Sequence, residues 1–394
     1  MNQRSYKAVG INLKAVPMGE FDRLVTVLTK ERGLLRVIAP GARKHKSKLG
    51  GRSGLFVVND SLFSKGKSLD KLIQAETVKS FPGLSQNLAK LTASQYLAEI
   101  ALAQALTDQP QEDLYYLLIE HLTRLEAAAK PDILACLAQA TFHMLALAGV
   151  APDVFRCCLS RSHLTAQLGN PDWRVGFSVS SGGAIDLAEI ERLECDRLRE
   201  IEHIEREWHN QRAGATAFTD SDQTSDQTTD SYRVREKEIS RGAPYAQNSQ
   251  NTQPWQTALR AKVAQEVKRN LGIVGYLSAA ELALMQQLSK PELVMSSAGL
   301  APTMRATNSQ ASSEADPQFA AKSGTIQSGI TRADRTTAPK FMANSGLEES
   351  EPHLMWRHIE QFLRQYAQYQ FDRPIKSAAL IDTCFTSPSY AARV

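Results

Sequence analysis

The sequence predicts an α+β protein, with a small closed five-stranded β-barrel at the N-terminus and an all-helical C-terminal domain. Three observations predict this architecture. Five short runs of β-branched and aliphatic residues occupy the first 82 residues, helical hydrophobic spacing recurs afterwards, and two long polar stretches interrupt the helical part. Because closure hides the edges of so small a sheet, short strands without long helices between them favour a barrel.

The predicted barrel covers residues 1–82, where turn-forming residues separate the strands. Glycine, proline, asparagine and aspartate mark turns because they adopt backbone conformations, or make local hydrogen bonds, that end strands. The expected strands are Tyr6–Lys14, Leu24–Thr29, Leu34–Ala39, Leu55–Val58 with Ser61–Phe63, and Leu72–Val78. The expected turns are Pro17–Gly19, Glu31–Gly33, Pro40–Gly41, Asn59–Asp60 and Lys65–Lys67.

Residues 83–385 are expected to form the helical domain. One stripe at helical spacing contains Leu114, Leu118, Leu122 and Leu125. A second helix is expected between the start signal at Asp132 and the stop signal at Gly149. The other expected helices are Leu88–Leu106, Leu187–Trp208, Ala258–Leu293 and His353–Phe371, and an extended piece, Ile375–Phe385, is expected to close the fold.

Two stretches, about residues 211–257 and 296–351, are predicted to be disordered insertions in the helical domain. Both are rich in small polar residues and poor in aliphatic ones, so they cannot bury enough apolar surface to offset the entropy of ordering. A long flexible surface loop adds little closure entropy, which makes such insertions tolerable.

Positive charge is concentrated at the N-terminus. The first 54 residues hold twelve lysines and arginines against three acids, a balance of +9, so the remaining 340 residues carry −5 of the total charge of +4. A basic end on an otherwise slightly acidic chain is typical of a protein that binds a polyanion. The alternative is a solvated surface rich in lysine and arginine.

The basic segment Gly41–Gly54 carries five cationic side chains and no acid. It lies between two expected strands and has no hydrophobic run, so we expect a mobile loop at the open face of the barrel. Lysines and arginines there can neutralise phosphates and release counterions, which gives affinity without sequence preference. The alternative is a loop that only increases solubility.

Aromatic side chains can add affinity by stacking on unpaired bases. In a domain this small each candidate is more readily explained as a core residue, so the sequence names no stacking residue. The candidates are Tyr6, Phe21, Phe56, Phe63 and Phe81.

The cysteines predict neither structural disulfides nor a standard zinc site. Their number, five, is odd, and the polar opening Met1–Lys7 lacks the pattern of a secretory leader, so we expect a reducing cytosolic setting. A zinc ribbon needs two C-x₂-C pairs, whereas Cys157 is followed by Ser160 at the pair position, and no second pair follows Gly183. Cys157, for which His163 could supply a second ligand, is only a weak metal candidate, and we expect no zinc or other cofactor.

One charge-free run, Ile133–Val150, approaches the length that spans a bilayer. It is rich in alanine and places Gln139 and His143 on one helical face, so a buried helix of a bundle explains it better than a membrane span. We expect no membrane association.

The sequence contains no motif of a catalytic site. A phosphate-binding loop, a G-x-S-x-G turn and an H-E-x-x-H helix are all missing, and His121 and His143 are interpreted as ordinary helix residues. We therefore expect a protein that is not an enzyme.

Several motifs resemble the RecO family of recombination mediators. They are the turn Gly19–Arg23, the T-x-E-x-G-L run Thr29–Leu34, the A-x-G-A-R-K-x-x-S run Ala39–Ser47, the segment Pro152–Cys157, and the R-P-x-K-S motif Arg373–Ser377 that follows the helix FLRQYAQYQF. The resemblance covers about residues 1–207, 258–294 and 353–385, and leaves out the two insertions.

The resemblance implies an oligonucleotide-binding (OB-fold) barrel over residues 1–82 and a helical domain over residues 83–385. It also implies a protein of the cytoplasm and nucleoid that binds single- and double-stranded DNA and anneals complementary strands. Such a protein contacts the C-terminal tail of the single-strand-binding protein and, with RecR and in some cases RecF, helps to load RecA. Many members carry a four-cysteine zinc loop. The corresponding loop here, about residues 156–186, is degenerate, because Ser160 replaces the second cysteine and the later pair is missing.

Charge determines the expected site residues. The DNA-facing set is expected to comprise Lys7, Lys14, Arg36, Arg43, Lys44, Lys46, Lys48 and Arg52. For the acidic partner tail we expect Arg364, Arg373 and Lys376, beside Phe362 and Tyr366. Two other functions are open: a stand-alone single-strand- or RNA-binding protein without mediator activity, and a nuclease or nucleotide hydrolase on a helical scaffold, against which the missing motifs argue.

Overall fold

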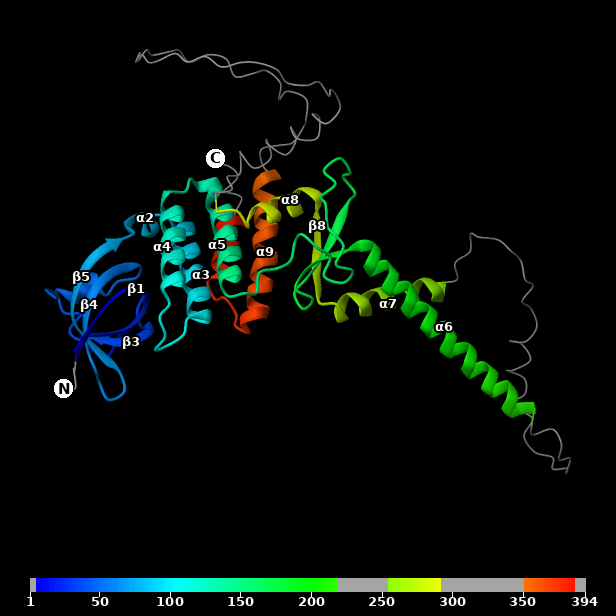
Figure 1. Ribbon diagram of the computed structural model, residues 1–394, viewed down its shortest axis with the longest axis horizontal. Helices are drawn as coiled ribbons and strands as arrows, with labels where there is room; N and C mark the ends of the chain where they lie inside the picture. The colour runs from blue at the N-terminus through cyan, green and yellow to red at the C-terminus, as the bar shows by residue number, and fades with distance from the viewer. Residues whose placement is uncertain (1–4, 218–253, 292–350, 387–394) are drawn as a thin grey trace, which may run out of the picture. The chain divides into compact units, whose positions relative to one another are not determined.

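The computed structural model describes residues 5–217, 254–291 and 351–386 (Figure 1). These residues fall into two compact units. Of the described residues, the first unit combines the barrel with most of the helices, from residues 5–154, 166–173, 277–291 and 351–386, and the second is built from residues 155–165, 174–217 and 254–276. The barrel and the helical bundle therefore share a unit, and most of the segment with the degenerate zinc loop, apart from residues 166–173, belongs to the other.

The N-terminal residues form a closed barrel with strand order β1-β2-β3-β5-β4, which confirms the five-stranded prediction. All pairings are antiparallel except that between β3 and β5, which is parallel. A short helix, α1 (Leu49–Arg52), lies between β3 and β4. The strands are β1 (Ser5–Met18), β2 (Asp22–Thr29), β3 (Gly33–Ala39), β4 (Val57–Ser64) and β5 (Asp70–Ser80).

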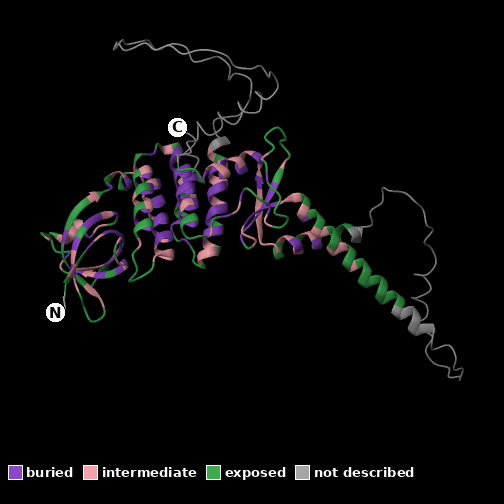
Figure 2. Cartoon of the chain, viewed as in Figure 1, coloured by how far each residue is buried: buried purple, intermediate pink, exposed green. Residues whose placement is uncertain are grey.

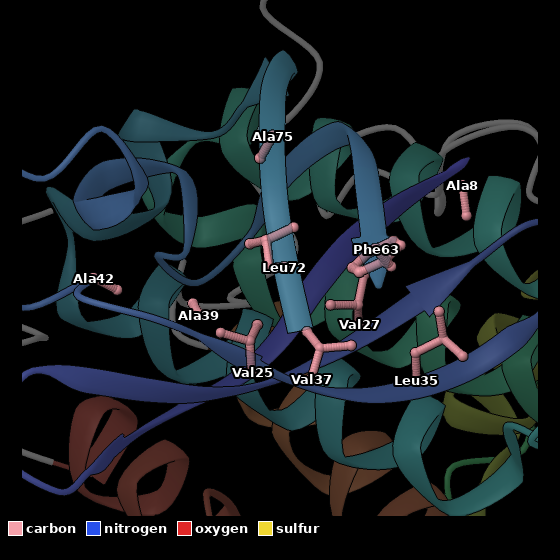
Figure 3. Close-up of a cluster of buried hydrophobic side chains, with 10 residues drawn as sticks. All are labelled: Ala8, Val25, Val27, Leu35, Val37, Ala39, Ala42, Phe63, Leu72 and Ala75. Atoms are coloured by element: carbon pink, nitrogen blue, oxygen red, sulfur yellow. The ribbon is translucent and has the colours of Figure 1, made fainter. Parts of the chain in front are cut away.

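Alternating side chains of the strands fill the barrel (Figure 3). Because side chains alternate across a strand, Val25 and Val27 of β2 point inward while Thr26 between them points outward. The same alternation places Arg36 outside the barrel, between two buried neighbours. The buried cluster consists of Ala8, Val25, Val27, Leu35, Val37, Ala39, Ala42, Phe63, Leu72 and Ala75.

A bulge in β1 decides where Lys14 points. The pairing of β1 with β2 shifts register between Asn12 and Lys14, and this extra residue exchanges the two faces of the strand. Asn12, before the bulge, is buried and its side-chain amide donates to the carbonyl oxygens of Arg52 and Gly54, both at 2.8 Å. Lys14, after the bulge, is exposed on the outer face.

The predicted turn at Asn59–Asp60 is wrong, because both residues lie inside β4. Asn59 is buried, and both polar atoms of its side chain have hydrogen-bond partners. The Asn59 side-chain N–H donates to the Arg52 carbonyl at 2.9 Å, and the Thr77 hydroxyl donates to the Asn59 side-chain oxygen at 3.1 Å. A polar pair that signals a turn in sequence can thus occupy a strand when tertiary hydrogen bonds satisfy it.

The helical bundle is centred on α5, which packs against α3, α4 and α9. Figure 2 shows α5 buried along most of its length, which explains the charge-free run without a membrane. In the part of the chain that the structure describes, no helix is long and apolar enough to cross a bilayer. The helices are α2 (Pro82–Ser85), α3 (Leu88–Gln104), α4 (Glu112–Ala127), α5 (Ile133–Leu147), α8 (Ala279–Gln287), α9 (Glu351–Phe371) and α10 (Ala378–Thr386).

The leucine stripe on α4 is confirmed, but the extended end of the fold is not. Residues 378–386, expected to be extended, form α10. The preceding R-P-x-K-S motif is a turn whose amides are capped from afar: the Glu99 carboxylate accepts from the backbone N–H groups of Lys376 (2.5 Å) and Ser377 (3.2 Å). Capping of free N–H groups stabilises the start of a helix.

The second unit contains a small sheet, which the prediction of a helical C-terminal domain did not include. The sheet has the order β7-β6-β8, and the strands are β6 (Arg174–Ser178), β7 (Gly183–Asp186) and β8 (Ile273–Ser278). The expected helix Ala258–Leu293 is divided because Gly272, with φ of +60°, ends α7 before β8 begins. The helices of the unit are α6 (Leu187–Ala217) and α7 (Pro254–Asn270).

The predicted insertions are partly tested. Residues 211–217 and 254–257 belong to α6 and α7, so the edges of the first predicted insertion are helical. The rest of that insertion, and all but the last residue of the second, lie outside the described residues.

Candidate nucleic-acid interface

The outer face of the barrel carries a patterned surface across β1, β2 and β3. In one row Lys14 pairs with Thr26, and Thr26 with Arg36, so the two cations flank a hydroxyl. The next row is apolar. The strand face, as we call this surface, consists of Lys14, Val16, Leu24, Thr26, Arg36 and Ile38, together with Lys71.

Lys71 joins the strand face through the parallel pairing of β3 with β5, where it lies opposite Ile38. The apolar row of Val16, Leu24 and Ile38 therefore ends at a lysine. Val16 is 39% exposed, and the other two apolar side chains are partly exposed. Sequence reasoning missed Lys71, because nothing in the segment Asp70–Ser80 shows that it returns beside β3.

The basic loop, residues Gly41–Gly54, is tied to the turn between β1 and β2. The Asp22 carboxylate accepts from the Gly41 N–H at 2.7 Å, and the Arg43 guanidinium donates to the Gly19 carbonyl at 3.1 Å. The Phe21 carbonyl accepts from the Arg43 N–H at 2.9 Å. These bonds fix the start of the loop against the end of the strand face, which differs from the free, mobile loop that the sequence predicts.

Arg23 fixes the far end of the basic loop. Its guanidinium donates to the Gly50 carbonyl at 3.1 Å and to the Ser53 hydroxyl at 2.9 Å. Arg23 is thus a structural cation. The exposed cations lie between the two anchors, and they are Arg43, Lys44, Lys46 and Lys48.

The structure brings most of the predicted DNA-facing cations to one end of the barrel. Lys14 and Arg36 lie on the strand face, and Arg52 is half-buried at the end of α1. Lys7 does not join them. It pairs with Leu62 of β4 and lies seven residues before Lys14, about 23 Å along an extended strand.

Phe21 is the exposed aromatic of this region. The residue is 45% exposed, and the Lys44 ammonium lies 5.3 Å from the ring centroid. The other aromatic candidates are occupied. Tyr6 donates to Asp70 at 2.5 Å, and burial together with that carboxylate raises the pKa of the Tyr6 hydroxyl well above its usual range. The remaining candidates, Phe56, Phe63 and Phe81, are buried.

The predicted peptide site around Arg364 is not a surface. Arg364 is 9% exposed and donates to both Asp382 oxygens and to Glu360, all at 2.8 Å. Phe362 and Tyr366 are each 2% exposed and belong to the core of the bundle. The helix pattern could not show that α10 covers this side of α9. The side chains of Arg373 and Lys376 are exposed.

The Glu360 carboxyl is affected strongly by this environment. Burial raises the pKa of Glu360 to about 7, although Arg364 favours its ionised form. The hydrogen bonds from the Arg364 guanidinium, together with its charge, lower the pKa of the Asp382 carboxyl. This network connects α9 with α10 and is structural.

The donor set of the degenerate zinc loop does not fit a four-ligand zinc site. Cys157 is buried, and its sulfur accepts a hydrogen bond from the Asp186 N–H at 3.4 Å. The Ser160 hydroxyl, at the second ligand position, is hydrogen-bonded to the Ser162 hydroxyl at 2.9 Å. Among the residues that the structure describes, no group of three or more histidines, cysteines or carboxylates is placed to hold a metal ion. A structural zinc site needs four such ligands.

The strand face and the basic loop can hold a polyanion and contact apolar groups beside it. Five exposed cations (Lys14, Arg36, Arg43, Lys44 and Lys71) surround the apolar row. A closed five-stranded barrel with such a face, joined to a helical bundle, defines the class of the protein as an OB-type barrel protein.

Comparisons with known proteins agree with this class. The family model "Recombination protein O N terminal" matches residues 1–81, and "Recombination protein O C terminal" matches residues 85–204. The chain is 41% identical to the DNA repair protein RecO of Nostoc sp. (strain PCC 7120) over 98% of this chain and 97% of that one. It is 40% identical to the Nostoc punctiforme protein of the same name over the same shares.

A shorter match is closer in sequence. The DNA repair protein RecO of Gloeothece citriformis is 60% identical over 48% of this chain and 67% of its own length. The chain belongs to the recombination protein O family, and the family places it in DNA repair.

Proposed function

We propose that this chain is a non-catalytic mediator of DNA repair that binds and anneals single-stranded DNA and helps to load RecA on DNA coated with single-strand-binding protein. The observation that carries the proposal is the strand face, where exposed cations border a partly exposed apolar row in register across three strands. We include double-stranded DNA as a second ligand, since phosphate contacts do not distinguish the two forms.

Annealing brings two polyanions together, so its main barrier is charge repulsion. Lysines and arginines lower that barrier by neutralising phosphates and releasing counterions. Contacts that are limited to the backbone leave the base edges free to pair with a second strand. A strand held along the basic loop and the strand face would keep its bases available in this way.

The residues of the proposed site support a role without covalent chemistry. The strand face consists of cations, a hydroxyl and aliphatic side chains, and holds no carboxylate, histidine or cysteine. A hydrolytic site needs a nucleophile with a base, or a metal with its ligands.

The expected protein partners are the acidic tail of the single-strand-binding protein, RecR and in some cases RecF, in the cytoplasm and at the nucleoid. Of the residues predicted for the tail, Arg373 and Lys376 are exposed, at the turn before α10. Because Arg364 is buried, we propose that the peptide contacts these two cations and not the α9 side chains.

The test is an annealing assay on complementary strands coated with single-strand-binding protein, followed by RecA loading. We expect faster annealing and loading with this chain, and a weaker effect when the coating protein lacks its acidic tail. Tight DNA binding without any acceleration of annealing or loading would instead support the alternative, a stand-alone single-strand-binding protein.

A further inference from the structure

We propose that Phe21 stacks on an unpaired base of the bound strand and makes the site selective for single strands. The inference rests on the proposed function and names a contact within the same site. It begins from the position of Phe21, in the turn between β1 and β2, where the strand face meets the basic loop.

The backbone around Phe21 is fixed although its ring is not covered. The Phe21 carbonyl accepts from the Arg43 N–H, the neighbouring Asp22 carboxylate accepts from the Gly41 N–H, and Arg43 donates to the Gly19 carbonyl. None of these bonds uses the aromatic ring, and the residue is 45% exposed. A rigid turn that presents an aromatic side chain to solvent loses little entropy when a ligand covers the ring.

The surroundings of the ring match a nucleotide, with its flat base and its charged phosphate. Lys44 lies over the ring at 5.3 Å, and Arg43 is exposed beside it. The end of β1, which leads into the same turn, presents Val16 and Met18, which are 39% and 38% exposed. A base on the Phe21 ring would displace the Lys44 ammonium toward the phosphate, so the cation would keep a partner.

Selectivity follows from access to the base. In a duplex both faces of each base are covered by stacking, whereas an unpaired base offers a face to an aromatic ring. The cations of the basic loop attract both forms of DNA, so a contact that needs an open base face must supply the preference for single strands.

The experiment compares two oligonucleotides of equal length: oligothymidylate, and an abasic strand with the same phosphates. We expect Phe21→Leu to weaken binding of oligothymidylate by about tenfold while binding of the abasic strand stays within about twofold. Phe21→Trp should restore the affinity for oligothymidylate. Tyr369→Leu, which replaces an aromatic residue that is 54% exposed on α9, is the matched control and should change neither affinity.

Two results would overturn stacking: an equal loss on both strands, which would indicate a structural role for Phe21, or no loss on either. Failure of Phe21→Trp to restore binding would contradict it as well. Failure of the proposed function would look different, because the unsubstituted chain would then bind neither oligonucleotide.

A separate observation concerns the degenerate zinc loop in the second unit. We infer that hydrogen bonds to the Leu271 carbonyl, and not a metal ion, hold its second turn. The hydroxyls of Ser178, Ser180 and Ser181 all donate to this one oxygen, the latter two at 2.8 and 3.4 Å. Leu271 comes from the end of α7, about 90 residues further along the chain.

Gly272 makes this closure sterically feasible. A Cβ atom at this position would lie 2.4 Å from the Ser180 hydroxyl oxygen, and the backbone has φ of +60°. The first turn is also closed without a metal, since the Cys157 N–H donates to the Ser162 carbonyl at 2.8 Å and the Arg161 N–H to the Cys157 carbonyl at 2.9 Å. Although partial burial opposes ionisation, hydrogen bonds to the sulfur lower the pKa of the Cys157 thiol.

The test combines metal analysis with hydrogen exchange on the full chain. We expect no stoichiometric zinc after purification from zinc-supplemented medium, and no change in exchange of the turn Ser178–Gly183 with EDTA. Ser180→Ala and Gly272→Ala should each speed hydrogen exchange in this turn. The matched control is Gly19→Ala, since Gly19 has the same φ of +60° but no atom within 4 Å of its Cβ position. Gly272→Ala should therefore speed exchange in its turn more than Gly19→Ala does in the turn that contains Gly19. One bound zinc per chain whose removal speeds exchange, or no effect of either substitution, would refute the inference.

Discussion

Replacing Lys44, Lys46 and Lys48 by alanine tests the electrostatic basis of the proposed interface. All three side chains are exposed, and they lie between the anchored ends of the basic loop. Arg43 is left in place because its guanidinium holds the turn at Gly19, so its removal would mix a change of charge with a change of structure. The triple variant should therefore fold normally and lose only phosphate contacts.

The size of the effect follows from counterion release. Each phosphate contact contributes about −0.7 to the slope of log K against log salt for single strands, so losing three contacts should make the slope shallower by about 2.1. Between about 50 and 200 mM salt this changes the affinity ratio of the two proteins by about 20-fold, with the larger difference at low salt.

The assay is fluorescence anisotropy with a labelled oligonucleotide across a salt series. The matched control is the triple variant of Lys7, Lys65 and Lys67, which removes three exposed cations of the same barrel that lie in β1 and in the β4–β5 turn, outside the basic loop. Its slope should be close to that of the unsubstituted chain. Equal slopes for the two triple variants would refute the assignment, because charge would then act regardless of position.

Three further predictions concern stability. Arg364→Ala should lower the free energy of unfolding by about 3–5 kcal/mol in urea denaturation, because it leaves the Glu360 carboxyl buried without its cation. The control Arg373→Ala removes an exposed cation and should change the free energy of unfolding by less than about 0.5 kcal/mol. Similar values for the two variants would contradict the buried network. Asn59→Ala should cost about 1–3 kcal/mol by the same measurement, because buried polar partners lose their bonds, and a neutral result would argue against the pairing of β4 that we describe. Burial, with a smaller contribution from His143, lowers the pKa of His121 to about 3 from an ordinary value of 6.5. Between these two values the unfolded chain binds a proton that the folded chain does not. The free energy of unfolding should therefore fall as the pH drops from about 6.5 toward 3. His121→Gln should make this fall less steep in acid denaturation, and an unchanged profile would show that other groups dominate it.

Local pattern was sufficient for most elements of the fold. The five strands were predictable because β-branched runs separated by glycine and proline leave few other conformations, and the α4 stripe because its leucines repeat at helical spacing. The errors lie where distant contacts decide. Asn59–Asp60 signals a turn locally, but hydrogen bonds from Thr77 and to Arg52 hold it in β4.

The candidate site was predictable in part. Composition identified the basic loop and its cations, because charge asymmetry is a property of the sequence. The structure added Lys71, showed which of the five aromatic candidates is exposed, and separated Lys7 and Arg364 from the residues predicted to act with them. Each of these changes depends on a strand register, a parallel pairing or a covering helix, none of which leaves a local pattern in the chain.

The sequence by itself determined the kinds of element, the order in which they follow, and the excess of positive charge near the N-terminus, because these depend on residues that are neighbours along the chain. The tertiary structure decided which cations meet on one face, which aromatic ring remains uncovered, and that a carbonyl at Leu271 closes the degenerate zinc loop. The physical reason is that exposure and hydrogen-bond satisfaction depend on what packs against a residue, and the packing partners come from distant parts of the sequence.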